Sequence, residues 1–327
     1  MSNVEFMNKL LASYGPKCPL DQLVEQLNNL YHAAEARDYD ERHVEIREQL
    51  PLLWREMTRV AQEQCASTEF RILDFGCGTG FEADQLLLEL PRSSISALTC
   101  YDPSSDMLRH CQTKISPHFP KAVFCDDLER LPVDSSPYNL LATNSLLHHV
   151  PNPVETVRNL LPYLAPDAVW IAGHEPSCRF YRRTECLEAL ERFQRQRKWR
   201  RFLQLGNYLR RLKTQVGLRS SPAEEAARES VRQGLFTKRP PAHFVTLLVD
   251  FHVAHSPDEA AAGRGLDFEA MQKDFAGIWE MVWMKTYSFM GPFYEGGLPR
   301  RWSRICRELA EIFPDDGCNF CTVWVRA

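Results

Sequence analysis

The sequence predicts an α/β protein built on a doubly wound, mostly parallel sheet. Two features of the chain carry this prediction. The apolar run at residues 71–75 ends beside a carboxylate and gives way to three alternating glycines, which indicates a strand, a ligand-binding loop and the start of a helix. Further β-rich runs at 96–102, 122–125, 138–144 and 168–175 follow with helical patterns between them, as in repeated strand–helix units.

The glycine loop favours an adenosyl cofactor over NAD. Glycine lets the backbone take positive φ and leaves no Cβ between the loop and a bound molecule. The dinucleotide pattern G-x-G-x-x-G requires glycine at position 81, but Phe81 stands there and the third glycine is Gly80. Asp74, near the strand end, would repel a pyrophosphate and attract an ammonium or sulfonium group, directly or through water. This charge pattern fits S-adenosylmethionine (SAM).

A second carboxylate follows at the position that a ribose requires. The predicted strand at 96–102 ends in Asp102, which lies 22 residues beyond Gly80. A carboxylate there can accept hydrogen bonds from both ribose hydroxyls, as the acidic residue of nucleotide-binding βαβ units does.

These motifs, in this order, resemble the class I SAM-dependent methyltransferases over residues 70–176. The resemblance implies a doubly wound seven-stranded sheet, SAM as the cofactor, Met107 packed against adenine, and Asp126 and the backbone near Asp127 at the polar edge of adenine. Relatives often carry Asp where Asn139 stands, and a Pro-Gly-Gly turn where this chain has residues 165–167. The predicted cofactor-binding residues are Tyr39, His43, Asp74, Gly76, Gly78, Gly80, Asp102, Met107, Asp126, Asp127 and Asn144.

The chain divides into four predicted parts. Residues 1–66 form an N-terminal helical lid with two helices between 20 and 66, and residues 67–176 form the SAM-binding Rossmann-like core. Residues 177–282 form a mainly helical insertion after the fifth strand, which roofs the substrate. Residues 283–327 add strands and a helix that complete the core, with an antiparallel last strand at 319–325. Within the insertion we expect a strand at 243–251 and a helix at 267–282.

Tyr39 and His43 lie between the two predicted N-terminal helices. Many small-molecule methyltransferases place a tyrosine from such a segment over the cofactor, so both residues are candidates for a lid. The alternative is a plain helix junction with exposed polar groups.

Candidate catalytic residues follow the carboxyl ends of the fourth and fifth strands. Asn144 can orient an amine or instead cap the turn after its strand. His149 is a candidate base, and either His148 or His149 is expected to be structural because the two point in different directions if helical. Glu175 can act in catalysis or satisfy backbone groups. Tyr181 can offer its ring to a sulfonium or belong to the core.

Composition excludes several classes. The 327 residues are 44% apolar with a net charge of −4, and no apolar stretch is long enough to span a membrane, so we expect a cytoplasmic protein. The eleven cysteines show no pairing pattern, which favours reduced thiols, and we expect no metal centre. Residues 179–219 carry thirteen Lys or Arg and three Glu. This segment predicts either internal ion pairs or an acidic carrier protein as partner, and nucleic acid is disfavoured.

Three functions fit the sequence. The leading one is a methyltransferase acting on a small molecule, as in secondary metabolism, with S-adenosylhomocysteine (SAH) as the product. The alternative is a cyclase in which the amine of SAM attacks its own γ-carbon, closing azetidine-2-carboxylate and releasing methylthioadenosine. The third is a SAM-binding or carrier-protein-binding module without catalysis.

Overall fold

The computed structural model describes residues 3–36, 39, 43, 48–131, 137–203, 220–253, 265–292 and 295–327. Its centre is a seven-stranded sheet of order β3-β2-β1-β4-β5-β8-β6, in which only β8 is antiparallel to its neighbours. The strands of the sheet are β1 (Phe70–Phe75), β2 (Ile95–Tyr101), β3 (Val123–Cys125), β4 (Tyr138–Asn144), β5 (Leu164–Pro176), β6 (Trp279–Tyr287) and β8 (Asn319–Arg326), and the short strand β7 (Phe289–Pro292) is not part of it. The predicted α/β class, the strand number and the antiparallel last strand are confirmed.

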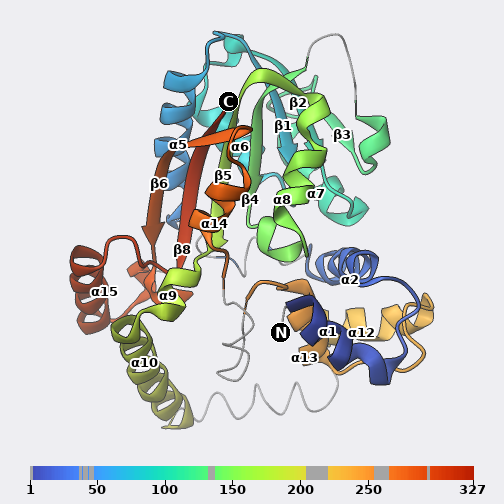
Figure 1. The fold of residues 1–327 in the computed structure, drawn as a ribbon, viewed down its shortest axis with the longest axis vertical. Coiled ribbons are helices and arrows are strands. Elements are labelled where there is room, and N and C mark those ends of the chain that lie inside the picture. Colours follow the sequence, from blue (N-terminus) through green and yellow to red (C-terminus); the bar gives the residue numbers. More distant parts are fainter. Residues whose placement is uncertain are drawn as a thin grey trace.

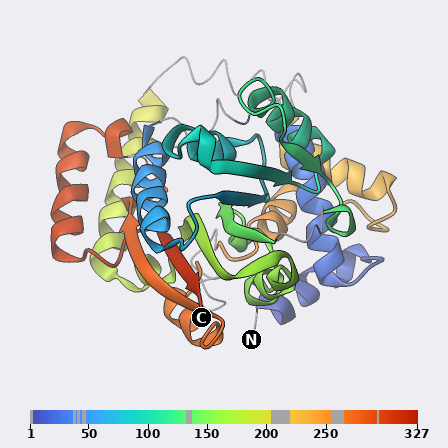
Figure 2. The ribbon, with the colours of Figure 1, turned by 90° about the horizontal axis from the view of Figure 1, so that it is seen from above.

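Helices cover both faces of the sheet (Figure 2). They are α1 (Asn3–Leu11), α2 (Leu20–Glu35), α5 (Leu50–Gln64), α6 (Phe81–Glu89), α7 (Ser105–Ile115), α8 (Pro153–Asn159), α9 (Cys178–Arg182), α10 (Thr184–Leu203), α12 (Pro222–Arg232), α13 (Ala242–Val249), α14 (Phe268–Asp274) and α15 (Arg300–Ile312). On one face, Trp54 of α5 and Leu86 of α6 pack in the same core as Ile72. On the other, Phe275, just after α14, packs with Trp170 and Trp324. Strand residues therefore alternate between two buried layers, as a doubly wound sheet requires.

The N-terminal helices and the second half of the insertion share one core. Leu23 and Leu27 of α2 pack with Ala227 of α12 and Leu248 of α13. Figure 1 shows these helices together beyond the lower end of the sheet, with α2 closest to it. Helices α1 and α2 from residues 1–66 and helices α12 and α13 from residues 177–282 thus form a joint layer that places α2 over the edge of the sheet.

The predicted strand at 243–251 is wrong, because α13 occupies this segment. Its apolar run fits a buried helix as well as a strand. Pro240 and Pro241 precede it, and Pro241 is the residue at which the helix starts. Val245, Leu248 and Val249 are buried against α2 and α12, and this packing stabilises the helical conformation of the segment.

The predicted helix at 267–282 is too long. It ends at Asp274, and Gly277 takes a φ of 76° before β6 begins at Trp279. The boundary between residues 282 and 283 therefore falls inside β6. Earlier in the chain, α8 ends at Asn159, and a short turn that contains Pro162 leads into β5 at Leu164.

The basic segment is only partly described, since residues 204–219 lie outside the described ranges. In the described part, arginines pair with acidic partners, including Arg183, between α9 and α10, with Asp316 (2.6 Å) and Arg192 of α10 with Glu188 (2.6 Å). None of the described helices combines the length and the apolar character needed to cross a bilayer.

Candidate functional site

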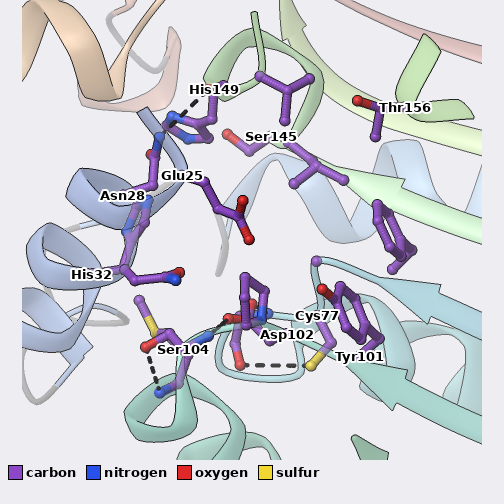
Figure 3. Close-up of a pocket in the computed structure, with 18 of the residues that line it drawn as sticks. Glu25, Asn28, His32, Cys77, Tyr101, Asp102, Ser104, Ser145, His149 and Thr156 are labelled. Atoms are coloured by element: carbon purple, nitrogen blue, oxygen red, sulfur yellow. Dashed lines mark hydrogen bonds between the residues drawn. The ribbon is translucent and has the colours of Figure 1, made fainter. Parts of the chain in front are cut away.

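A cavity of about 470 Å³ lies at the carboxyl ends of β1, β2 and β4. This volume is in the range of small-molecule sites. One wall is the glycine loop and the turn after β2, and the opposite wall is α2 (Figure 3). Among the predicted site residues, the cavity brings together Tyr39, Gly76, Gly78, Asp102, Met107, Asn144 and His149.

The glycine loop takes left-handed backbone angles at each glycine, with φ of 78° at Gly76, 51° at Gly78 and 85° at Gly80. A Cβ added at Gly76 would lie 2.7 Å from Leu146, and one at Gly80 would lie 2.8 Å from the Cys111 sulfur. A Cβ at Gly78 would meet nothing within 4 Å. Two glycines are therefore required by packing, and Gly78 leaves open space beside the cavity. Gly80 does not line the cavity; it is the N-cap residue of α6.

Asp102 fastens the glycine loop to the turn after β2. Its Oδ2 accepts from the backbone N–H of Gly78 and its Oδ1 from that of Ser104, both at 2.8 Å. Each oxygen keeps a further lone pair, so the carboxylate can still accept from a pair of ribose hydroxyls. Burial raises the pKa of Asp102 to about 6.

Three predicted carboxylates lie elsewhere. Asp74 is fully buried under the loop and accepts from the N–H of Ala83 at 3.1 Å, so it caps the start of α6 and does not line the cavity. Asp127 caps the short turn at 128–130 by accepting from Glu129 N at 3.0 Å. Neither Asp127 nor Asp126 lines the cavity, and Leu128 does.

Asn144, at the end of β4, is held in one orientation. The indole N–H of Trp54 donates to its Oδ1 at 3.1 Å. Because that bond fixes the amide oxygen, the Nδ2 donor is the group left for a ligand.

The contacts of Glu175 are those of a structural residue, which is the second of the two roles expected for it. It is fully buried and accepts from the backbone N–H of Leu146 (2.9 Å), Leu147 (2.8 Å) and His148 (3.2 Å). It also pairs with Nδ1 of His148 at 2.8 Å. Burial alone would raise its pKa, but the His148 ring and the backbone donors outweigh burial and lower it. Glu175 thereby fixes the segment that carries His149.

His149 lines the cavity, whereas His148 is buried beside Glu175, so one histidine of the pair is structural as expected. Nδ1 of His149 lies 2.7 Å from the carbonyl of Val249 and must donate to it, so in the neutral ring Nε2 carries a lone pair. Burial and the His148 ring lower the pKa of His149 to about 4. The ring of His32 lies 5.2 Å away, and burial together with His149 lowers its pKa to about 3. Both imidazoles are therefore neutral at pH 7.

Potential metal ligands also meet here. One atom from each of His148, His149 and Asp250 lies within 4.8 Å of the others.

Tyr39 and His43 are neighbours, with ring centroids 4.3 Å apart. Tyr39 lines the cavity, whereas His43 stands behind it, with Nε2 3.8 Å from Glu35. Tyr181 lies outside the cavity, in the cluster that contains Phe180 and Leu190. The chain leaves the sheet at the end of β5, and α9 carries Tyr181 toward α10 and α15.

Sequence reasoning missed the polar face of α2. Glu25, Asn28, Asn29 and His32 line the cavity, and among the described residues 177–282 contribute nothing to its lining. Among the described residues, the wall opposite the glycine loop is thus α2, which α12 and α13 support from behind. These four residues recur at helical spacing beside the buried face of Leu23, Val24 and Leu27, and this second stripe was the available signal.

Residues 73–170 match the family described as "Methyltransferase domain". This segment is a class I SAM-dependent methyltransferase domain. The resemblance, the fold and the SAM cofactor predicted for this domain are thereby confirmed.

The methyltransferase domain has curated relatives that share part of the chain. A malonyl-[acyl-carrier protein] O-methyltransferase of Bacillus cereus is 31% identical over 121 residues, which are 36% of this chain and 43% of that protein. The enzyme of the same name from Halalkalibacterium halodurans is 32% identical over 30% of this chain and 36% of its own. The chain thus spans less than half the length of these relatives.

A solved structure, the plantazolicin methyltransferase BpumL in complex with SAH, covers 94% of this chain and 98% of its own at 16% identity and a TM-score of 0.43. That score is too low to support an inference.

Proposed function

We propose that the protein transfers the methyl group of SAM to a small acceptor bound under α2. The observation that carries this proposal is the shared cavity, because the glycine loop and Asp102 form one wall and the polar face of α2 forms the other. A cofactor on the first wall and an acceptor on the second would meet without an intervening barrier. A metabolite of secondary metabolism fits a site of this size.

Several residues of the chain would have separate roles in this reaction. Gly78 leaves room for the cofactor, Asp102 accepts from its ribose, and Met107 packs beside its base. The Nδ2 of Asn144 donates to its amino-acid end. SAM supplies an electrophilic methyl group, and the protein positions the acceptor in line with it while excluding water. Nε2 of His149 accepts a hydrogen bond from the methyl acceptor and holds it in place.

The acidic carrier protein at residues 179–219 stays a prediction. Its support is the printed name of the relatives, which act on an acyl-carrier protein. Against it stand the ion pairs within the described part: Arg182 with Asp267 (3.2 Å), Arg183 with Asp316 (2.6 Å) and Arg195 with Glu191 (2.9 Å). These pairs offset much of the positive charge that a carrier protein would meet.

The cyclase is the second candidate, because Asn144 lines the cavity as that reaction requires. Its other expected residue, Tyr181, lies in a separate cluster. The methyltransferase therefore has the stronger support.

One assay separates these functions. The protein is incubated with SAM, with and without a mixture of amine, alcohol and thiol acceptors, and the adenosine product is identified by mass spectrometry. SAH that forms only with an acceptor supports the proposal. Methylthioadenosine that forms from SAM alone establishes the cyclase, and SAM binding without either product establishes a binding module. Asp102→Ala is the control that should abolish turnover by loss of cofactor binding.

A further inference from the structure

The wall opposite the glycine loop is rich in hydrogen-bond acceptors. Glu25 projects from α2 into the middle of the cavity, across from Asp102 (Figure 3). Asn28 follows one turn later along α2, and His149 lies beside it. Carboxylate, amide oxygen and unprotonated imidazole nitrogen all accept hydrogen bonds.

The orientation of Asn28 is fixed by its donors. Nδ2 donates to the carbonyl of Val24 at 2.9 Å and to that of His149 at 3.4 Å. The amide oxygen must therefore face away from these carbonyls, and it is buried without a hydrogen-bond partner. An unsatisfied buried acceptor is unfavourable, and a hydrogen-bond donor on the ligand would satisfy it.

The acidic side chains around the cavity also favour a positively charged ligand. Five carboxyl groups line the cavity, whereas no Lys or Arg is among the described lining residues; the five are Asp21, Glu25, Glu82, Asp102 and Glu155. Burial raises the pKa of Glu82 well above its ordinary value, so Glu82 is not counted as a charge here. A cleft lined by one sign of charge concentrates ligands of the opposite sign.

We propose that the methyl acceptor is a primary amine, which binds as its ammonium ion to Glu25, Asn28 and His149. This inference rests on the proposed function and names its substrate class. The three N–H donors of an ammonium match the three acceptors, and its charge matches Glu25.

The step balances without a further reactant. One proton of the bound ammonium passes to water, which leaves a neutral amine that donates a hydrogen bond to Nε2 of His149. The nitrogen lone pair forms a bond to the methyl carbon of SAM as the carbon–sulfur bond breaks, and its electrons stay on sulfur to give SAH. The product is a secondary ammonium ion together with SAH.

The test compares three probes of similar shape: phenethylamine, 2-phenylethanol and 3-phenylpropanoate. Calorimetry first measures SAH binding and then the binding of each probe to the SAH complex at pH 7.5. We expect phenethylamine to bind about tenfold more tightly than the alcohol, since a charge-assisted hydrogen bond is worth roughly 1.5–3 kcal/mol. We expect 3-phenylpropanoate to bind more weakly than both.

Glu25→Gln keeps the shape of the side chain and removes its charge. It should weaken phenethylamine binding about tenfold and leave SAH affinity within a factor of about two. Glu63→Gln, at an exposed position on α5, is the matched control and should change neither.

The outcomes separate the two proposals. If SAH binds but the three probes bind equally, or the carboxylate binds best, the amine assignment is overturned and the methyltransferase proposal stands. If Glu25→Gln leaves phenethylamine affinity unchanged, the assignment is overturned as well. If SAH itself does not bind, the proposed function falls first.

Discussion

The indole of Trp54 on α5 holds the amide of Asn144 at the end of β4, with its Nε1 donating to Oδ1 at 3.1 Å. Trp54 is fully buried, so this bond joins the core to the site. Trp54→Phe keeps the aromatic packing and removes the donor, which frees the Asn144 amide to rotate. Since a net hydrogen bond is worth roughly 0.5–1.5 kcal/mol, SAH affinity should fall about three- to tenfold by calorimetry.

Trp302→Phe is the matched control for this change. Trp302 donates to Gln196 in a different cluster, so its loss should leave SAH affinity unchanged. Equal effects of the two substitutions would show that Trp54 acts only through stability.

Glu175→Gln should lower the free energy of unfolding by about 3 kcal/mol, measured by denaturant titration. The four donors that surround Glu175 suit a carboxylate, and an amide NH₂ would oppose at least one of them. An unchanged unfolding free energy combined with lost turnover would restore the catalytic role predicted from sequence.

The sequence predicts the role of a site residue well when the residues that contact it are near in the sequence. The left-handed glycines and Asp102 sit in a short strand–loop–helix unit whose geometry follows from the local pattern, and the structure has the expected backbone there. Asp74 has the same local setting, but its side chain turns under the loop to cap α6. The pattern fixes the position of a residue and leaves the direction of its side chain open.

Long-range packing decides the rest. The sequence of α13 is compatible with a strand or a helix. Its contacts with α12 and with α2, which lies more than 200 residues earlier in the sequence, select the helix. Tyr181 follows β5 by a few residues, yet α9 directs it into the core with Phe180. The polar stripe on α2 acquires a role only because α12 and α13 cover the opposite side of that helix.

Gly78→Ala and Gly76→Ala should separate cofactor binding from folding. Both positions have positive φ, so each alanine costs about 1 kcal/mol of backbone strain. At Gly78 the new Cβ meets no protein atom and occupies space beside the cavity, so the main effect should be weaker SAH binding. At Gly76 the Cβ meets Leu146, so the main effect should be a larger loss of unfolding free energy. The reverse pattern would contradict this placement of the cofactor.

SAH affinity should depend on pH through Asp102. Burial raises the pKa of this carboxyl to about 6, above its ordinary value. The group is therefore protonated below pH 6, and its contribution to folding stability is lost as the pH rises through 6. If the ribose hydroxyls bind the ionised form, affinity should fall up to about tenfold per pH unit below 6 and level off above it. Calorimetry between pH 5 and 8 checks this, and Asp102→Asn should remove the dependence.

His149→Ala should lower kcat/KM about tenfold and leave SAH affinity unchanged, because the variant removes a hydrogen bond to the methyl acceptor and no cofactor contact. The groups that face His149 are His148, Asp250, His32 and Glu175, and burial keeps its pKa near 4. The ring is thus neutral above pH 5, so its ionisation should not reduce kcat between pH 6 and 8. His110→Ala, an exposed change on α7, is the control.

The same assay with EDTA should give the same kcat, and a loss of kcat would instead assign His148, His149 and Asp250 to a metal site.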